Sequence, residues 1–320
     1  MSLYTGSELI MFYNVENLFL PDPKPQFRNH SSKSGLFNWN QYRYDIKLRK
    51  IAHVFRLIQE ESGQLPMICG LAEIQGKEVL KDLLKQDIFN GYHFVHYESL
   101  DERGVDVALL YDTSKIEVLH SEPITYFFKI NHADSTAFDT TRDVLYTQLK
   151  YQGELIHFFV VHLPSKREDD INKPKRAFIL KKIADRISEI LTKSDALVMV
   201  CGDFNEDPTS DMLNLLTIDG NFNTLLTNPF KNIFLSKKFS TYHHDIGMVF
   251  DQILLSNQFF NGLQNIQFKN AMIFNHNALV AKSHGKGTKP FRTYSGSRYL
   301  GGYSDHFPVI CEIETNFKQS

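Results

Sequence analysis

An aspartate and an asparagine directly follow an apolar run in the second half of the chain. Residues 198–201 are apolar, as is typical of a buried strand, and Gly202 interrupts the run. Asp203 and Asn205 come next, so a carboxylate and an amide stand at a strand end. Such residues are also common turn formers, and this motif alone does not separate a reactive site from a turn.

Polar side chains of matching chemistry stand at the ends of four other strand-like runs, which cover residues 10–13, 67–72, 158–161 and 307–310. In layered α/β folds the ends of several strands converge on one face, where ligands bind and catalysis takes place. We therefore expect these side chains to form one divalent-metal and phosphate site. The predicted members are Asn14, Glu73, His162, Asp203, Asn205, Asp305 and His306.

Two segments have the periodicity of amphipathic helices. Apolar residues recur at helical spacing from Leu48 to Ile58 and from Ala177 to Leu191. Residues 105–111, 143–150 and 154–161 resemble strands. This alternation predicts an α/β fold in which helices cover a sheet.

Long connections at residues 21–42, 128–141, 221–244 and 275–303 indicate functional loops or insertions. The last one has cations interleaved with tyrosines directly before Ser304, a composition that suits a phosphate backbone and an unstacked base. A merely solvated charged loop remains an equal alternative. The cations are Lys282, His284, Lys286, Lys289, Arg292 and Arg298, and we expect Lys286, Lys289 and Arg292 to contact substrate.

Composition limits the classes of protein that remain. The net charge of −2 means that any polyanion must meet a local basic patch. The three cysteines lie in or beside apolar runs, which favours a reducing compartment. No linker divides the chain, so we expect one domain over residues 1–320. No run is apolar enough to span a bilayer. We expect a cytoplasmic, monomeric protein. A removed signal peptide stays an open alternative.

Six short motifs in a fixed order resemble those of the endonuclease/exonuclease/phosphatase superfamily of metal-dependent phosphoesterases. This resemblance spans nearly the whole chain and implies a four-layer α/β/β/α sandwich with two packed mixed sheets. The motifs cover residues 14–17, 71–75, 161–165, 202–205, 250–253 and 304–309.

The resemblance also implies a bound Mg²⁺ or Mn²⁺ ion, which prefers oxygen ligands. Glu73 is the first expected ligand. Asn14 would supply an amide oxygen, and Asp305 a second carboxylate or a water-mediated contact.

By the same resemblance, Asp203 is the general base that activates water, and Asn205 positions the water or the phosphate. His306, held by Asp251, would stabilise phosphoryl charge as an imidazolium. Three further roles follow: His162 protonates the leaving group or binds phosphate, Arg142 binds phosphate as a bidentate donor, and Asp106 orients His162.

The sequence thus predicts phosphodiester hydrolysis by direct water attack, with nucleic acid as the expected substrate. Phospholipid head groups or inositol phosphates are the alternative substrates. A non-catalytic binding module on the same fold is the alternative class, although such modules usually lose members of the acid and histidine set that is complete here.

Overall fold

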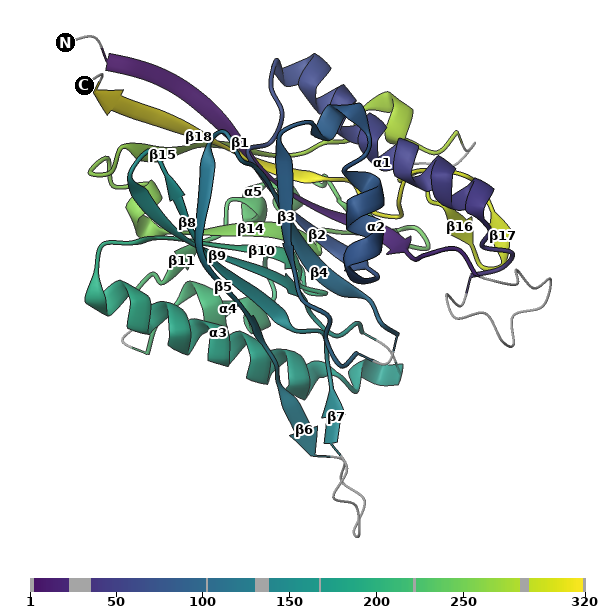
Figure 1. The fold of residues 1–320 in the computed structure, drawn as a ribbon. Helices are drawn as coiled ribbons and strands as arrows, with labels where there is room; N and C mark the ends of the chain where they lie inside the picture. The colour runs from purple at the N-terminus through teal and green to yellow at the C-terminus, as the bar shows by residue number, and fades with distance from the viewer. Residues whose placement is uncertain are drawn as a thin grey trace.

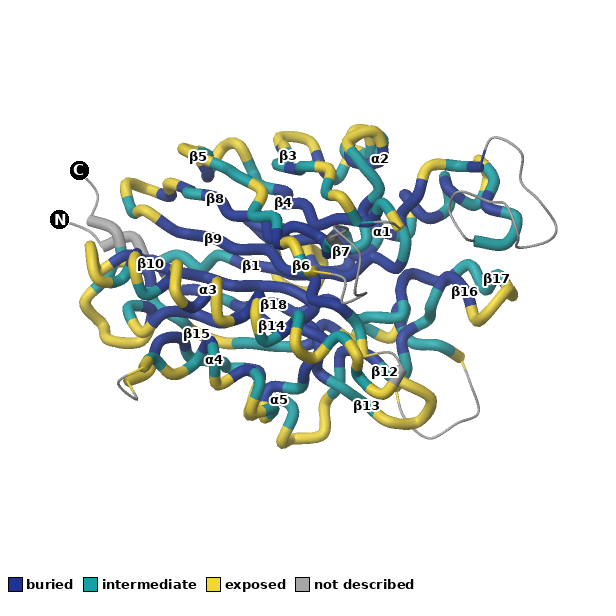
Figure 2. The backbone as a smooth tube through the Cα atoms, turned by 90° about the horizontal axis from the view of Figure 1, so that it is seen from below, coloured by how far each residue is buried: buried dark blue, intermediate teal, exposed yellow. Residues whose placement is uncertain are grey.

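The computed structural model describes residues 3–22, 36–101, 103–129, 138–166, 168–220, 223–282 and 288–318. Two six-stranded sheets pack face to face, and the longer helices lie on their outer faces (Figure 1). Most strands of both sheets are buried, whereas exposed residues gather on the helices and connections (Figure 2). This architecture is the predicted four-layer α/β/β/α sandwich with two mixed sheets.

Each sheet has a parallel pair of strands at its centre with antiparallel strands on both sides. The first sheet has the order β15 (Ile266–Ile273), β18 (Val309–Lys318), β1 (Leu3–Leu18), β2 (Ile68–Ile74), β4 (Asp106–Asp112) and β3 (Tyr92–His96). The second has the order β11 (Leu226–Thr227), β14 (Asp251–Ser256), β10 (Leu197–Asp203), β9 (Glu154–His162), β8 (Val144–Tyr151) and β5 (Ile116–Ile124). The parallel pairs are β1 with β2 and β9 with β10.

The helices follow the predicted periodicities. α1 (Gln41–Ser62) begins at Asn40, whose side chain accepts a hydrogen bond from the Arg43 backbone N–H, and ends at Gly63 in the left-handed conformation. α3 (Lys173–Lys193) packs its apolar face on the outside of the second sheet. The shorter helices are α2 (Gly76–Leu83), α4 (Asn214–Thr217) and α5 (Phe230–Leu235).

The long connections contain short elements. Their two-stranded pairs are β6 (Phe127–Lys129) with β7 (Phe138–Thr140), β12 (Thr241–His243) with β13 (Ile246–Met248), and β16 (Tyr294–Ser295) with β17 (Arg298–Tyr299). Single 3₁₀ turns are η1 (Asp87–Phe89), η2 (Glu168–Asp170), η3 (Asp211–Leu213), η4 (Asn257–Phe259) and η5 (Asn277–Leu279).

The core between the sheets is closely packed. A Cβ atom on Gly70 of β2 would lie 2.6 Å from Sγ of Cys201 on β10, so this glycine permits the close approach of the sheets.

All three cysteines are buried and free. Within the described chain, no helix has the length and apolar character needed to cross a membrane.

The strand directions bring the predicted site residues to one end of the sandwich. The carboxyl ends of β1, β2, β9 and β10 point to this end, and the antiparallel β14 and β18 begin there. A hydrogen bond from Asn14 on β1 to Asp203 on β10 connects the two sheets at this end. The fold therefore positions side chains from six strands or strand ends around one site.

Candidate active site

Asp203 lies buried at the carboxyl end of β10, where two groups hold its carboxylate. Oδ2 accepts a hydrogen bond from Asn14 Nδ2 at 3.1 Å, and Oδ1 accepts one from the Asn205 backbone N–H at 3.0 Å. Asn205 has a φ of 50°, and its side-chain Nδ2 donates to the Leu163 carbonyl at 2.9 Å. Burial raises the pKa of Asp203 to about 7, which suits a general base near neutral pH.

His306 and the fully buried Asp251 form a hydrogen-bonded pair across the two sheets. His306 Nδ1 donates to Asp251 Oδ2 at 2.7 Å, and Ser240 Oγ donates to the same oxygen at 2.6 Å. Burial alone would lower the pKa of His306, but the Asp251 carboxylate, with Asp305 and Asp203, raises it well above its ordinary value. His306 is therefore an imidazolium, and its free Nε2 lies 3.9 Å from Asp203 Oδ2.

His162 also lies beside Asp203 and has the opposite protonation preference. Its Nε2 is 3.8 Å from Asp203 Oδ2 and 4.0 Å from Glu73 Oε1. Burial, with the positive charges of Arg142 and His306, lowers the pKa of His162 well below its ordinary value. His162 is therefore a neutral imidazole at neutral pH.

The predicted contact between Asp106 and His162 is absent from the structure. Asp106 accepts hydrogen bonds from the backbone N–H and the hydroxyl of Ser99. His162 Nδ1 has no hydrogen-bond partner within the described part of the chain. The structure therefore does not bring Asp106 to His162 as predicted, because both carboxylate oxygens of Asp106 accept hydrogen bonds from Ser99 instead.

Glu73 lies in a β-bulge of β2 in the left-handed conformation, with a φ of 66°. The bulge turns its side chain into the site. Oε2 accepts a hydrogen bond from the Asn17 backbone N–H at 2.8 Å, and Oε1 points toward His162. Glu16, Asn17 and Asn205 also have positive φ values, so strained backbone gathers around this site, as is common where function requires it.

The donor chemistry of the predicted ligands fits a hard divalent cation. Glu73 offers Oε1, and Asp305 offers Oδ1, which lies 3.9 Å from His306 Nε2, while its Oδ2 accepts from Arg292 at 3.0 Å. Asn14 Oδ1 already accepts from the Glu16 backbone N–H at 3.0 Å, so it has one remaining lone pair. Oxygen donors of this kind suit Mg²⁺ or Mn²⁺.

Potential ligand atoms of Asp203, Asp251 and His306 also lie within 4.8 Å of one another. However, the proton on His306 Nδ1 is shared with Asp251, and the remaining nitrogen belongs to an imidazolium. A protonated imidazole is not a metal ligand. This group is therefore better described as an acid–base cluster than as a metal centre.

Arg142 lies buried in the connection before β8, as predicted, and its guanidinium is incompletely paired. Nε is 3.8 Å from Asp101 Oδ2, beyond hydrogen-bond distance, and has no hydrogen-bond partner among the described residues. Burial lowers the pKa of Arg142, against the attraction of Asp101 and Glu73. A buried donor without an acceptor in the protein is suited to an anionic ligand.

Two buried charges near the site were missed by the sequence analysis. Glu16 accepts hydrogen bonds from the backbone N–H groups of Thr293 and Tyr294 at 2.6 and 3.1 Å, and burial raises its pKa to about 7. Lys47 donates to Thr293 Oγ1 and the Tyr303 carbonyl, and burial lowers its pKa to about 8. The sequence did contain a sign of the buried Lys47, because this charged residue lies on the apolar face of the helix.

In the basic connection before Ser304, two of the cations predicted to contact substrate have acidic partners within the protein. Lys289 pairs with Asp245 at 2.5 Å, Arg292 pairs with Asp305, and Lys286 lies outside the described residues. The side chains of Tyr294 and Tyr303 are buried. Side chains of α1 contact both tyrosines. The two rings are therefore not exposed for stacking against a base.

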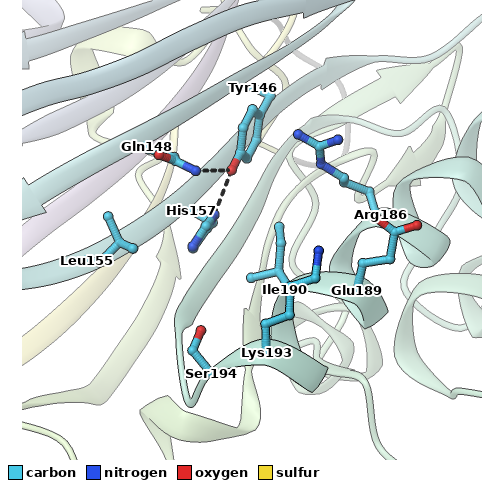
Figure 3. Close-up of a pocket in the computed structure, with 9 residues that line it drawn as sticks. All are labelled: Tyr146, Gln148, Leu155, His157, Arg186, Glu189, Ile190, Lys193 and Ser194. Carbon is cyan, nitrogen blue, oxygen red and sulfur yellow. Dashed lines mark hydrogen bonds between the residues drawn. The ribbon is translucent and has the colours of Figure 1, made fainter.

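A recessed cavity of about 450 Å³ lies on the outer side of the second sheet, between β8, β9 and α3 (Figure 3). In it the Tyr146 hydroxyl accepts from Gln148 Nε2 at 3.0 Å and lies 2.7 Å from His157 Nδ1. Leu155 and Ser194 place it toward the opposite end of the sandwich from Asp203. It is separate from the site described above.

Comparison with known proteins identifies the family of this chain. A sequence profile described as the Endonuclease/Exonuclease/phosphatase family matches residues 9–315. No curated protein sequence matches the chain.

Solved structures with the same fold were found at low sequence identity. An endonuclease/exonuclease/phosphatase family protein from Bacteroides thetaiotaomicron has a TM-score of 0.60 at 16% identity, covering 98% of this chain and 100% of that chain. Humanized D. rerio TDP2 carrying 14 mutations has a TM-score of 0.58 at 16% identity, covering 97% and 99%. A mannosyl-6-phosphatase from Bacteroides thetaiotaomicron has a TM-score of 0.58 at 16% identity, covering 96% and 99%.

Proposed function

Because this chain belongs to the endonuclease/exonuclease/phosphatase family of hydrolytic phosphoesterases, we propose that it is a divalent-metal-dependent phosphodiesterase that hydrolyses nucleic acid. The observation that carries the proposal is a buried cluster in which Asp203 Oδ2 lies 3.9 Å from Nε2 of the His306 imidazolium and 3.8 Å from Nε2 of the neutral His162. A general base with a pKa of about 7, flanked by two donors to phosphoryl oxygens, suits attack by water on phosphorus.

In this proposal Asp203 removes the proton from the attacking water. Asn14 and the Asn205 backbone N–H each donate to one carboxylate oxygen, so the base is held in place before the substrate binds. Water attacks phosphorus directly, the bond to the leaving oxygen breaks, and no covalent enzyme intermediate forms.

His306, His162 and Arg142 stabilise the negative charge of the phosphoryl oxygens. His306 supplies a full positive charge that Asp251 maintains. The lowered pKa of His162 favours phosphate binding through Nε2–H over protonation of the leaving group. Arg142 directs its unpaired Nε–H to the same phosphate.

Glu73, Asp305 and the Asn14 amide oxygen are the residues that would hold the metal ion. A bound Mg²⁺ or Mn²⁺ ion would neutralise charge on the phosphoryl group and on the leaving oxygen. The Asn17 backbone N–H and Arg292 orient the two carboxylates, as the outer partners of metal ligands commonly do.

Nucleic acid is proposed as the substrate because one structure of the same fold is D. rerio TDP2 complexed with single strand DNA product. A small phosphate ester is the second candidate. The neutralised Lys289 and Arg292 favour it, since they leave less free positive charge for a polyanion. The mannosyl-6-phosphatase of the same fold also supports it. Buried, free cysteines support a reducing, cytoplasmic setting.

A substrate panel tests this proposal. Single-stranded DNA, RNA, an activated aryl phosphodiester, a sugar phosphate and sphingomyelin are incubated with Mg²⁺, Mn²⁺ or EDTA. We expect cleavage of nucleic acid and of the aryl diester, abolished by EDTA. Turnover of the sugar phosphate or the lipid alone would establish another substrate class, and activity that resists EDTA would overturn the metal-dependent mechanism.

A further inference from the structure

A fully buried arginine beneath the site has no role in the chemistry described above. Arg176 lies in the first turns of α3 and has no exposed surface. Nε and Nη2 donate to Glu206 Oε1 at 3.0 and 2.7 Å, and Nη2 also donates to both oxygens of Asp170 at 2.7 and 2.8 Å. Nη1 donates to the Pro164 carbonyl at 3.1 Å.

These acceptors belong to the two loops that leave the catalytic strands. Pro164 and Asp170 are in the loop after His162, at the end of β9. Glu206 is in the loop after Asp203, at the end of β10. A planar guanidinium holds acceptors in a fixed geometry, which a lysine does not do. Arg176 therefore connects the ends of the two parallel strands that carry His162 and Asp203.

The same network reaches the strand that carries Asp251. Gln252, which follows Asp251 on β14, is fully buried, and its Nε2 donates to the backbone carbonyl of Glu206 at 2.6 Å. Besides the network around Arg176, the backbone of Leu163 also connects the two loops. Its N–H donates to the Asp203 carbonyl at 2.9 Å, and its carbonyl accepts from Asn205 Nδ2 at 2.9 Å.

The charges in this network balance, so it has no net charge to offer a ligand. Arg176 and Lys166 face Asp170 and Glu206, with Lys166 Nζ 2.9 Å from Glu206 Oε2. Ser210 Oγ donates to the same Glu206 oxygen at 2.8 Å. In the loop after His162, Asp170 has a left-handed backbone with a φ of 66°, and its carboxylate accepts both of its hydrogen bonds from Arg176 Nη2.

We propose that Arg176 is a positioning residue, which sets the separation of His162 from Asp203 and Asn205 by fastening the loops that follow them. The reaction to which this role contributes is the one proposed above, so the kinetic part of its test rests on that function. The distance that it controls is the 3.8 Å between His162 Nε2 and Asp203 Oδ2.

The test compares Arg176→Met and Arg176→Lys with Arg186→Met on the same helix. Arg186 is a matched control because its guanidinium is partly exposed and pairs with Glu122, remote from the site residues. All measurements are made where circular dichroism shows each variant fully folded. If Arg176→Met does not fold, Glu206→Gln replaces it, since this change removes one charge and keeps the side-chain size.

The first readout is independent of activity. The side-chain amide of Asn205 spans the gap between the two loops, so its ¹H–¹⁵N resonance reports their separation. We expect this resonance to move in Arg176→Met, to return part of the way in Arg176→Lys, and to stay unchanged in Arg186→Met. An inactive wild-type protein would count against the proposed function, and this readout would still decide whether Arg176 fastens the loops.

The second readout separates turnover from substrate binding. We expect kcat for an aryl phosphodiester to fall about a hundredfold in Arg176→Met, the scale expected for misplaced reacting groups, with KM nearly constant. Arg176→Lys should recover part of kcat. A folded Arg176→Met variant with unchanged kcat overturns the proposal, and so does a loss of kcat without movement of the Asn205 resonance.

Discussion

Replacing Asp251 with asparagine separates the charge of the His306–Asp251 pair from its shape. Asparagine has nearly the same size, and its amide oxygen can accept the hydrogen bonds from His306 Nδ1 and Ser240 Oγ that Asp251 Oδ2 accepts at 2.7 and 2.6 Å. Asp251 Oδ1 has no hydrogen-bond partner in the described residues, so the new amide nitrogen is left unpaired. This costs about 1–3 kcal/mol of stability, which a domain can tolerate.

The lost charge changes the protonation of His306. A hydrogen bond to a charged group contributes about 1.5–3 kcal/mol, and about 1.4 kcal/mol corresponds to a factor of ten. Protonation of His306 should therefore become roughly tenfold to a hundredfold less favourable. In the wild type the raised pKa of His306 keeps the imidazolium until the pH rises through that pKa. In Asp251→Asn the imidazolium is lost at lower pH.

The assay is kcat/KM for an aryl phosphodiester between about pH 5 and about pH 9, a range that spans the ordinary titration of histidine. We expect a small difference between the two proteins on the acid side and a deficit of roughly tenfold to a hundredfold on the alkaline side. Asp207→Asn is the control, because Asp207 Oδ1 accepts from the Val249 N–H at 2.9 Å and, within the described part of the chain, Asp207 has no hydrogen bond or ion pair with His306. Parallel pH profiles for wild type and folded Asp251→Asn would refute the reasoning.

Three further predictions test separate parts of the account. Glu73→Gln should raise the Mg²⁺ concentration for half-maximal rate about tenfold or more, and an unchanged metal titration would contradict its role as a ligand. Arg142→Lys should weaken inhibition by inorganic phosphate about tenfold or more, because lysine cannot replace the guanidinium fork, and equal inhibition constants would exclude a phosphate contact. Burial lowers the pKa of His157 below its ordinary 6.5, so its contribution to stability is complete above that value and is lost as the pH falls. The free energy of unfolding, measured in urea, should then decrease toward about pH 5, by at most about 1.4 kcal/mol per pH unit for this histidine. His157→Gln should reduce this slope, and an unchanged slope would contradict the assignment.

Local patterns in the sequence predicted the elements that position the site. The helical periodicities at residues 48–58 and 177–191 lie inside α1 and α3. The polar side chains at strand ends meet at one end of the sandwich because parallel strands within each sheet share a direction. The closeness of Asn14 to Asp203, across 189 residues of sequence, could be expected only by combining strand ends with the family resemblance.

Pairings between distant loops could not be predicted in the same way. Glu16 meets the backbone of Thr293 across 277 residues, and nothing near either residue in the sequence specifies this contact. The partner of Asp106 is nearby in sequence, since Ser99 lies only seven residues before it, but no residue pattern in this short loop indicates that it turns back onto the carboxylate. The same holds for Lys289 and Arg292, whose acidic partners are set by the folding of the connection and not by its composition.

The central claim is that Asp203 activates water for phosphoester hydrolysis. The most direct measurement is the initial rate of hydrolysis of an aryl phosphodiester in Mg²⁺ by Asp203→Asn and by wild type, with circular dichroism to verify the fold of both. We expect a loss of about a hundredfold or more, the scale for removal of a positioned general base. A folded Asp203→Asn variant with a rate near that of the wild type would contradict it.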